Sequence, residues 1–299
     1  MYQVIAESHG ATVAHYNLLP DKGWEVDLAQ MESIILGKEE QRPSDNEKVV
    51  RAILVNNPSN PTGAVYSEQH LMKICQLAEK YQIPIVSDEI YGDMTFGHHI
   101  FHPMANIAAK LGFSVPIITA SGLGKQCKFG VLYHDCTTCA ALTTCCAIVS
   151  HYFNTLFVRV HTLDLVPGWR LGWIVFQDNQ HGSIQEVKRG AQRLAQVILG
   201  SSHLAQVAIE AALNSDQEST ALWKKHLYST IEMQAEVLCG MLKDCHGLDV
   251  IFPNGGESNL AWIMHLLTSS IFPSLHSLMY LLQSIFSYVC NGANSSRHV

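Results

Sequence analysis

Four short clusters in the sequence combine residue types that could act together on one ligand. The first runs from Asn56 to Gly63 with the sequence Asn-Asn-Pro-Ser-Asn-Pro-Thr-Gly. Its two prolines and its glycine favour a rigid turn after an apolar stretch. Asn60, held in such a turn, could direct its side-chain amide at a ligand, although an ordinary Pro-Gly turn explains the same residues equally well.

The second cluster places an anion and a phenol close together. Asp88 follows an apolar stretch, and Tyr91 comes three residues later. A buried aspartate needs a cationic partner because an unpaired charge is costly to remove from water. A protonated pyridine nitrogen would be such a partner, and a structural salt bridge is the alternative.

The third and fourth clusters contribute an amine and a guanidinium group. Lys125 ends the run Ser-Gly-Leu-Gly-Lys that begins at Ser121, where it could form a Schiff base or remain a solvated surface lysine. The run lacks the third glycine and the downstream acid of a dinucleotide-binding fingerprint. Arg170 lies on a Pro-Gly turn before an apolar stretch, a position suited to bidentate phosphate binding.

The elements that must position these clusters follow from the apolar pattern. Strand, helix and strand in succession predict a parallel sheet flanked by helices, with ligands bound beyond the carboxyl ends of the strands. Ser67 is predicted to cap a helix that buries one apolar face. The predicted strands are 49–55, 83–87, 115–120 and 171–176, and the other predicted helices are 27–36, 184–198, 203–213 and 221–242.

Composition narrows the class of protein. The chain has 299 residues, 47% of them apolar, and a net charge of −7, so a large core is expected and a nucleic-acid-binding surface is not. The N-terminus shows no basic and apolar leader, so we expect a cytoplasmic chain with reduced cysteines. The segment 258–296 lacks Asp, Glu, Lys and Arg, but polar residues and Pro273 interrupt it, so a membrane span is not expected.

A metal site is a weaker alternative. Cysteine and histidine gather in one stretch, at His134, Cys136, Cys139, Cys145, Cys146 and His151. A structural zinc site usually shows two spaced pairs of ligands, whereas the second cysteine pair here is adjacent. We therefore predict no metal.

Taken together and in this order, the four clusters resemble those of the class I/II aminotransferases, which belong to the pyridoxal-phosphate-dependent fold type I. The sequences of these clusters are most similar to those of the tyrosine aminotransferase branch. The similar runs are Asn-Pro-Ser-Asn-Pro at 57–61, Asp-Glu-Ile-Tyr-Gly-Asp-Met at 88–94 and Leu-Val-Pro-Gly-Trp-Arg-Leu-Gly-Trp at 165–173. The resemblance covers roughly residues 2–125 and 165–256.

The resemblance implies an α/β fold, the large domain of the fold type I transferases, present incompletely. It assigns residues 1–256 to this partial domain, with a foreign insert at 126–164 and an unassigned uncharged tail at 257–299. It also implies transamination of L-tyrosine with 2-oxoglutarate in aromatic amino acid catabolism, by a homodimer.

The resemblance further implies a role for each site residue toward pyridoxal 5′-phosphate. Lys125 would form the Schiff base and move the substrate α-proton, and Asp88 would keep the ring nitrogen protonated. Asn60 and Tyr91 would hydrogen-bond the ring 3′-oxygen. Arg170 would bind the phosphate, with Ser121 nearby.

Three departures from the family pattern leave other readings open. Lys125 and Arg170 stand 45 residues apart, much farther than the family places them. The family's N-terminal third, with its phosphate-binding loop, and its substrate-carboxylate arginine are not identifiable. A catalytically impaired, truncated isoform and a related pyridoxal-phosphate-dependent carbon–sulfur lyase are the alternatives.

Overall fold

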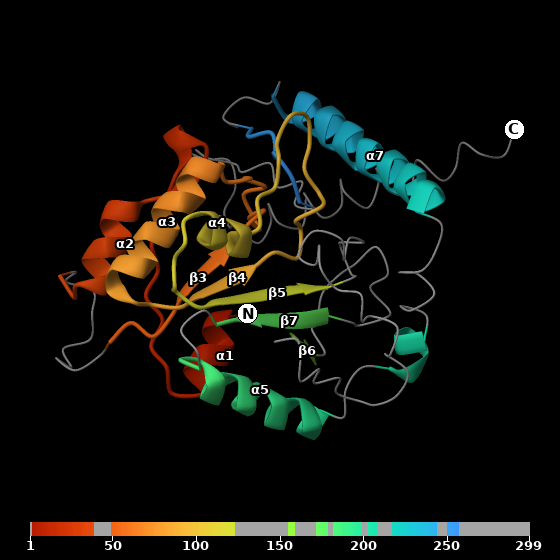
Figure 1. Cartoon of the computed structure of the whole chain (residues 1–299). Coiled ribbons are helices and arrows are strands. Elements are labelled where there is room, and N and C mark those ends of the chain that lie inside the picture. The colour runs from red at the N-terminus through yellow and green to blue at the C-terminus, as the bar shows by residue number, and fades with distance from the viewer. Residues whose placement is uncertain are drawn as a thin grey trace, which may run out of the picture. The chain divides into compact units, whose positions relative to one another are not determined.

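The computed structural model describes eight stretches of the chain, residues 2–38, 49–122, 155–158, 172–178, 182–198, 202–207, 217–243 and 250–256 (Figure 1). The chain divides into two compact units. The first comprises Met1–Glu236 with Phe252–Leu260, and the second comprises Val237–Ile251 with Ala261–Val299. All the described strands belong to the first unit, which is considered below.

A five-stranded sheet forms the centre of this unit, in the order β3-β4-β5-β7-β6. β3, β4 and β5 are parallel, β7 is antiparallel to β5, and β6 is antiparallel to β7. The α/β architecture and the mostly parallel sheet flanked by helices are thus as predicted. The strands are β3 (Ile53–Asn56), β4 (Ile85–Asp88), β5 (Ile117–Gly122), β7 (Gly172–Gln177) and β6 (Thr155–Val158).

Helices cover both faces of the sheet (Figure 1). α3 (Glu68–Tyr81) joins β3 to β4, and α4 (Met104–Lys110) joins β4 to β5. On the other face, α5 (Gln185–Ile198) packs its buried Ala195 with Phe176 and the partly buried Ile118 of the sheet. α7 (Gln217–Lys243) is the longest described helix.

The N-terminal part of the chain adds small elements to this frame. They are α1 (Tyr2–Ser8), β1 (Leu18–Leu19), the 3-10 turn η1 (Pro20–Lys22), β2 (Glu25–Val26) and α2 (Leu28–Ile35). β1 and β2 pair antiparallel. In the same stretch, Tyr16 donates its hydroxyl to the carbonyl of Leu54 at 2.7 Å, which fastens the stretch to β3.

α3 shows how closely the local sequence dictates the local structure. Ser67 caps the helix by accepting a hydrogen bond from the His70 N–H at 3.2 Å, which satisfies one of the unpaired N–H groups of the first turn. The side chains buried beneath it recur at helical spacing. They are His70, Leu71, Ile74, Cys75 and Ala78.

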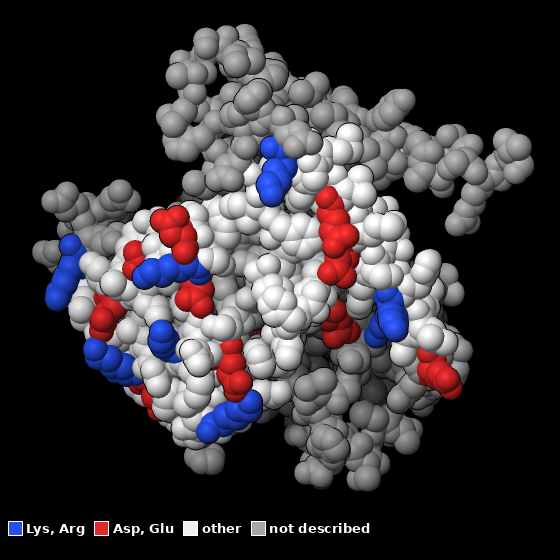
Figure 2. Space-filling view, turned by 90° about the horizontal axis from the view of Figure 1, so that it is seen from above, with Lys and Arg blue, Asp and Glu red and all other residues white. Residues whose placement is uncertain are grey.

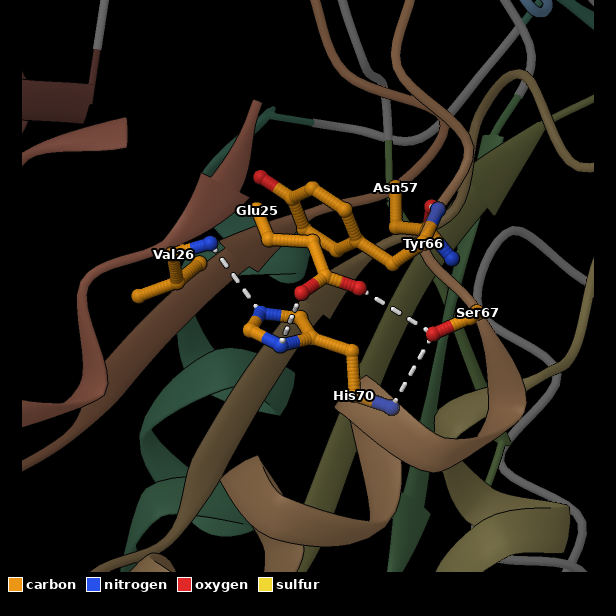
Figure 3. Close-up of polar contacts among 6 residues, drawn as sticks. All are labelled: Glu25, Val26, Asn57, Tyr66, Ser67 and His70. Atoms are coloured by element: carbon orange, nitrogen blue, oxygen red, sulfur yellow. Dashed lines mark hydrogen bonds and ion pairs between the residues drawn. The ribbon is translucent and has the colours of Figure 1, made fainter. Parts of the chain in front are cut away.

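A cluster of polar contacts around the buried His70 ties β2 to the start of α3 (Figure 3). The ring of His70 is 3% exposed; its Nε2 accepts from the Val26 N–H at 3.0 Å, and its Nδ1 lies 3.3 Å from Glu25 Oε2. Ser67 donates its hydroxyl to Glu25 Oε1 at 3.1 Å. Because Nε2 accepts, the ring proton sits on Nδ1 and the imidazole is neutral. Burial lowers the pKa of His70, against the opposing charge of Glu25.

The described surface mixes the two signs of charge. On the face seen in Figure 2, acidic and basic side chains lie beside one another instead of gathering by sign. Lys80 pairs with Glu32 at 2.7 Å, and Lys110 pairs with Glu68 at 2.6 Å. Among the described helices, none has both the length and the apolar composition needed to cross a membrane.

Two predictions fall mainly on other parts of the chain. The cysteine-rich stretch considered as a metal site lies outside the described residues. Of the insert predicted at 126–164, the structure describes Thr155–Val158, which forms β6 and pairs with β7. The insert and the tail at 257–299 stay predictions.

Candidate active site

The carboxyl ends of the three parallel strands place three of the chemistry-bearing segments at one edge of the sheet. Asn56 pairs with Asp88, and Asp88 pairs with Ala120. The loops that follow these residues begin side by side. This edge is where open α/β sheets bind their ligands.

Asp88 is the last residue of β4, and its groups are held from several sides. Its Oδ1 accepts from the Ile90 N–H at 3.3 Å, and its Oδ2 accepts from the hydroxyl of Tyr2 in α1. Its carbonyl accepts from the Asn57 N–H at 3.0 Å. Burial, and then the charge of Asp88, raise the pKa of Tyr2 well above its ordinary range, so this phenol remains a donor at neutral pH.

Tyr2 is the site residue that sequence reasoning missed. It stands 86 residues from Asp88, and no local motif marks it. Its one signal in the sequence was its membership of the opening stretch that resembles the family. The register of β4 and β5 places Asp88 on the same face as Ala120, which is the face that α5 covers.

Asn60 and Tyr91 come together, although they lie on different loops. The Asn60 side-chain amide is 3.5 Å from the Tyr91 hydroxyl oxygen. The Asn60 main-chain N–H donates to Asn56 Oδ1 at 2.6 Å, which fixes the turn on the end of β3. Tyr91 is 4% exposed, so its ring is held by packing.

The carboxylate next to Asp88 has a different environment. Successive side chains of a strand point to opposite faces, and Glu89 lies on the α4 side, where it is 5% exposed. Its Oε1 accepts from the Ser87 hydroxyl at 2.8 Å and from the Met104 N–H at 2.9 Å. Burial raises the pKa of Glu89 to about 7. Glu89 therefore anchors α4, whereas Asp88 lies on the opposite face of the sheet.

Of the other predicted site residues, the structure describes Ser121. It is buried near the end of β5, opposite Trp173 of β7, and its register places it on the Ser87 face of the sheet. Lys125 and Arg170 lie outside the described residues. The residues that flank them are described: Gly122, three residues before Lys125, pairs with Gly172, two residues after Arg170.

α7 supports the loop that carries Tyr91. Tyr228 and Ile231 of this helix pack against Ile90, Tyr91 and Met94. Polar contacts reinforce this packing. The Gly97 N–H donates to Glu232 Oε1 at 2.8 Å, and Lys224 Nζ lies 3.9 Å from Asp93 Oδ2.

Comparison with known proteins shows the family to which the chain belongs. The family model for class I and II aminotransferases matches residues 1–151 and 165–260. The chain belongs to the class I/II aminotransferase family. The matched region covers most of the chain and includes the segments that carry Asn60, Asp88, Tyr91 and Ser121.

Among curated relatives, the chain is similar to tyrosine aminotransferases. It is 33% identical over 256 residues to the enzyme of Dictyostelium discoideum, covering 85% of this chain and 49% of the relative. It is 34% identical over 255 residues to that of Bos taurus, covering 85% and 45%. The chain therefore spans about half the length of the curated relatives it matches.

Solved structures agree on the fold. The tyrosine aminotransferase of Leishmania infantum superposes with a TM-score of 0.60 at 24% identity, covering 85% of this chain and 49% of that one. An alanine aminotransferase of Pyrococcus furiosus gives a TM-score of 0.59 at 24% identity, covering 85% and 50%.

Proposed function

We propose that this chain binds pyridoxal 5′-phosphate and transfers the amino group of an aromatic amino acid, L-tyrosine, to 2-oxoglutarate. The observation that carries the proposal is that Asp88 and the Asn60–Tyr91 pair lie at the same carboxyl edge of the sheet. Membership of the aminotransferase family supports the reaction class. The similarity to tyrosine aminotransferases supports the choice of substrate.

The donor set fits this cofactor. A carboxylate at a strand end suits a protonated ring nitrogen, and an amide with a phenol suits the ring 3′-oxygen. Asp88, Asn60 and Tyr91 would supply these groups, and Ser121 would lie toward the phosphate. When bound, the cofactor supplies an electron sink that stabilises negative charge at the substrate α-carbon.

The residues of the chain would then hold the ligand and move one proton. Hydrogen bonds from Tyr2 and the Ile90 N–H stabilise the charged form of Asp88. Asn60 orients the Tyr91 hydroxyl at the site. Lys125 Nζ would take the proton from the substrate α-carbon and deliver it again, and Arg170 would bind the phosphate through its guanidinium group.

The pairing of Gly122 with Gly172 supports the assignments of Lys125 and Arg170. The chain leaves β5 and enters β7 at paired residues of the sheet edge that also bears Asp88. The long sequence separation between the lysine and the arginine is therefore compatible with one site. A homodimer is proposed on family grounds alone.

A catalytically impaired chain is the second candidate. It is favoured by the 45 residues that separate Lys125 from Arg170. Such a chain would keep the fold described above and fail to form the bond between Lys125 and the cofactor.

A visible absorption scan after addition of pyridoxal phosphate tests the proposal. A band of the lysine-bound cofactor should appear in the wild-type chain and disappear in Lys125→Ala. Lys110→Ala is the matched control, because Lys110 is an exposed lysine of α4 paired with Glu68. A band that survives Lys125→Ala equally well, or no band in any variant, would favour the impaired chain.

Product analysis then separates the reaction classes. Incubation with L-tyrosine and 2-oxoglutarate should yield glutamate and the keto acid in equal amounts. In a separate incubation with a sulfur-containing amino acid, release of a thiol, ammonia and a keto acid without glutamate would point to the lyase instead.

A further inference from the structure

A short segment near the end of the described chain crosses both loops of the candidate site. We call this segment, Pro253–Gly256, the strap. The N–H groups of Asn254 and Gly255 both donate to the Gly63 carbonyl at 2.9 Å. The Gly256 N–H donates to the Met94 carbonyl at 2.8 Å. The strap thus bonds two loops that are otherwise separate in sequence.

The two anchor points are equally distant from the two site residues. Gly63 comes three residues after Asn60, and Met94 comes three residues after Tyr91. Each anchor closes a tight turn that includes its site residue. The Gly63 N–H donates to the Ser59 carbonyl at 2.8 Å, and the Met94 N–H donates to the Tyr91 carbonyl at 2.8 Å. A shift of the strap would therefore be passed to both turns.

The strap is also closely packed against Gly63 and Met94. A Cβ on Gly63 would lie 2.4 Å from the Cβ of Pro253, and a Cβ on Gly255 would lie 2.3 Å from the Met94 carbonyl oxygen. Contacts this short do not occur between unbonded heavy atoms, so any side chain at either glycine would displace the strap. Gly63 also has a φ of +67°, which favours glycine on its own account.

We propose that the strap is a positioning element that sets the separation of the Asn60 amide and the Tyr91 phenol. It acts through the turns and touches neither ligand nor reacting atoms. Its consequence for the cofactor rests on the proposed function, because Asn60 and Tyr91 are the groups assigned to the ring oxygen. Its effect on Tyr91 itself does not depend on any cofactor.

Gly63→Ala offers a test with a matched control. Gly112 has a φ of +65°, and a Cβ added there would have nothing within 4 Å, so Gly112→Ala imposes the same backbone strain without the collision. A second substitution, Pro253→Gly, removes the nearest atom that an alanine at position 63 would meet, the Pro253 Cβ. The double variant Gly63→Ala with Pro253→Gly should therefore regain part of what Gly63→Ala loses.

Two readouts without cofactor and one titration with it separate the inference from the function on which it rests. Without cofactor, the ring carbon signal of Tyr91 in ¹³C-tyrosine-labelled chain should shift in Gly63→Ala, remain in place in Gly112→Ala and move back in the double variant. Amide exchange of Gly255 and Gly256 should be faster by about tenfold in Gly63→Ala alone. Titration with pyridoxal phosphate should show a loss of affinity of about tenfold in the same variant.

The outcomes are distinct. An unmoved Tyr91 signal in Gly63→Ala despite faster exchange at the strap would overturn the proposal, because the strap would then position nothing. An equal shift in Gly112→Ala would overturn it too. Absence of cofactor binding by the wild-type chain refutes the proposed function, while the Tyr91 signal still decides the role of the strap.

Discussion

Glu89 provides the most quantitative test of the site's surroundings. Burial raises the pKa of this carboxyl from 4.5 to about 7. The folded state therefore retains a proton that the unfolded state has released, and the free energy of unfolding falls as the pH rises from about 4.5 to about 7. Each pKa unit corresponds to about 1.4 kcal/mol, so the loss attributable to this group is about 3 kcal/mol.

Glu89→Gln is expected to abolish this pH dependence. The hydrogen bonds from the Ser87 hydroxyl and the Met104 N–H are accepted by Oε1, and glutamine keeps an oxygen there, so these two contacts can persist. The variant should match the wild-type chain near pH 4 and exceed it by about 2–3 kcal/mol at pH 8. Urea unfolding followed by circular dichroism at several pH values measures the difference.

Glu79 supplies a control of opposite sign. Although burial opposes it, hydrogen bonds from Ser114 and from the Val115 N–H lower the pKa of Glu79. Glu79→Gln should therefore have a lower free energy of unfolding than the wild-type chain at neutral pH. This difference should shrink as the pH falls below 4.5. A stability difference for Glu89→Gln that does not change with pH, or one that favours the wild-type chain at pH 8, would refute the reasoning.

Three further perturbations address the rest of the frame. Tyr2→Phe removes the hydroxyl donor to Asp88 and should weaken pyridoxal phosphate binding by about tenfold, since a hydrogen bond to a charged group contributes about 1.5 kcal/mol or more; an unchanged titration would contradict this. His70 is neutral, and burial lowers its pKa, while the charge of Glu25 raises it and that of Lys73 lowers it. The stability that the neutral ring provides should therefore be lost as the pH falls below about 6.5. His70→Gln should remove this pH dependence from urea unfolding curves between pH 5 and 7. Ser67→Ala removes the cap of α3 and should cost about 1 kcal/mol, and an unaltered urea midpoint would show that the cap contributes nothing.

The parallel part of the fold could be predicted because each element carries its own local signal. The helix after Ser67 combines a capping residue with an apolar face at helical spacing, and α3 begins and buries its side chains accordingly. The strands that end at Asn56 and Asp88 were visible as apolar, β-branched stretches bounded by polar residues. Their boundaries differ from the prediction by a few residues at most, as expected for strand ends.

The candidate site was predictable only where its residues share a motif. Asp88 and Tyr91 belong to one short run, and their meeting with Asn60 follows from the parallel register of β3 and β4. Tyr2 and the strap escaped prediction because both act through contacts between distant parts of the chain. The role of Tyr2 becomes visible only where the fold brings it to Asp88. The role of the strap becomes visible only where the fold brings it to Gly63.

Sequence separation is a poor guide to whether a catalytic lysine and a phosphate-binding arginine can share a site. The stretch between Lys125 and Arg170 argued against a common site when read along the chain. The structure pairs Gly122 with Gly172, so the chain leaves the sheet before the lysine and re-enters it after the arginine at neighbouring residues of one edge. The chain's competence therefore depends on where the lysine and the arginine point, which the absorption band and its loss in Lys125→Ala measure directly.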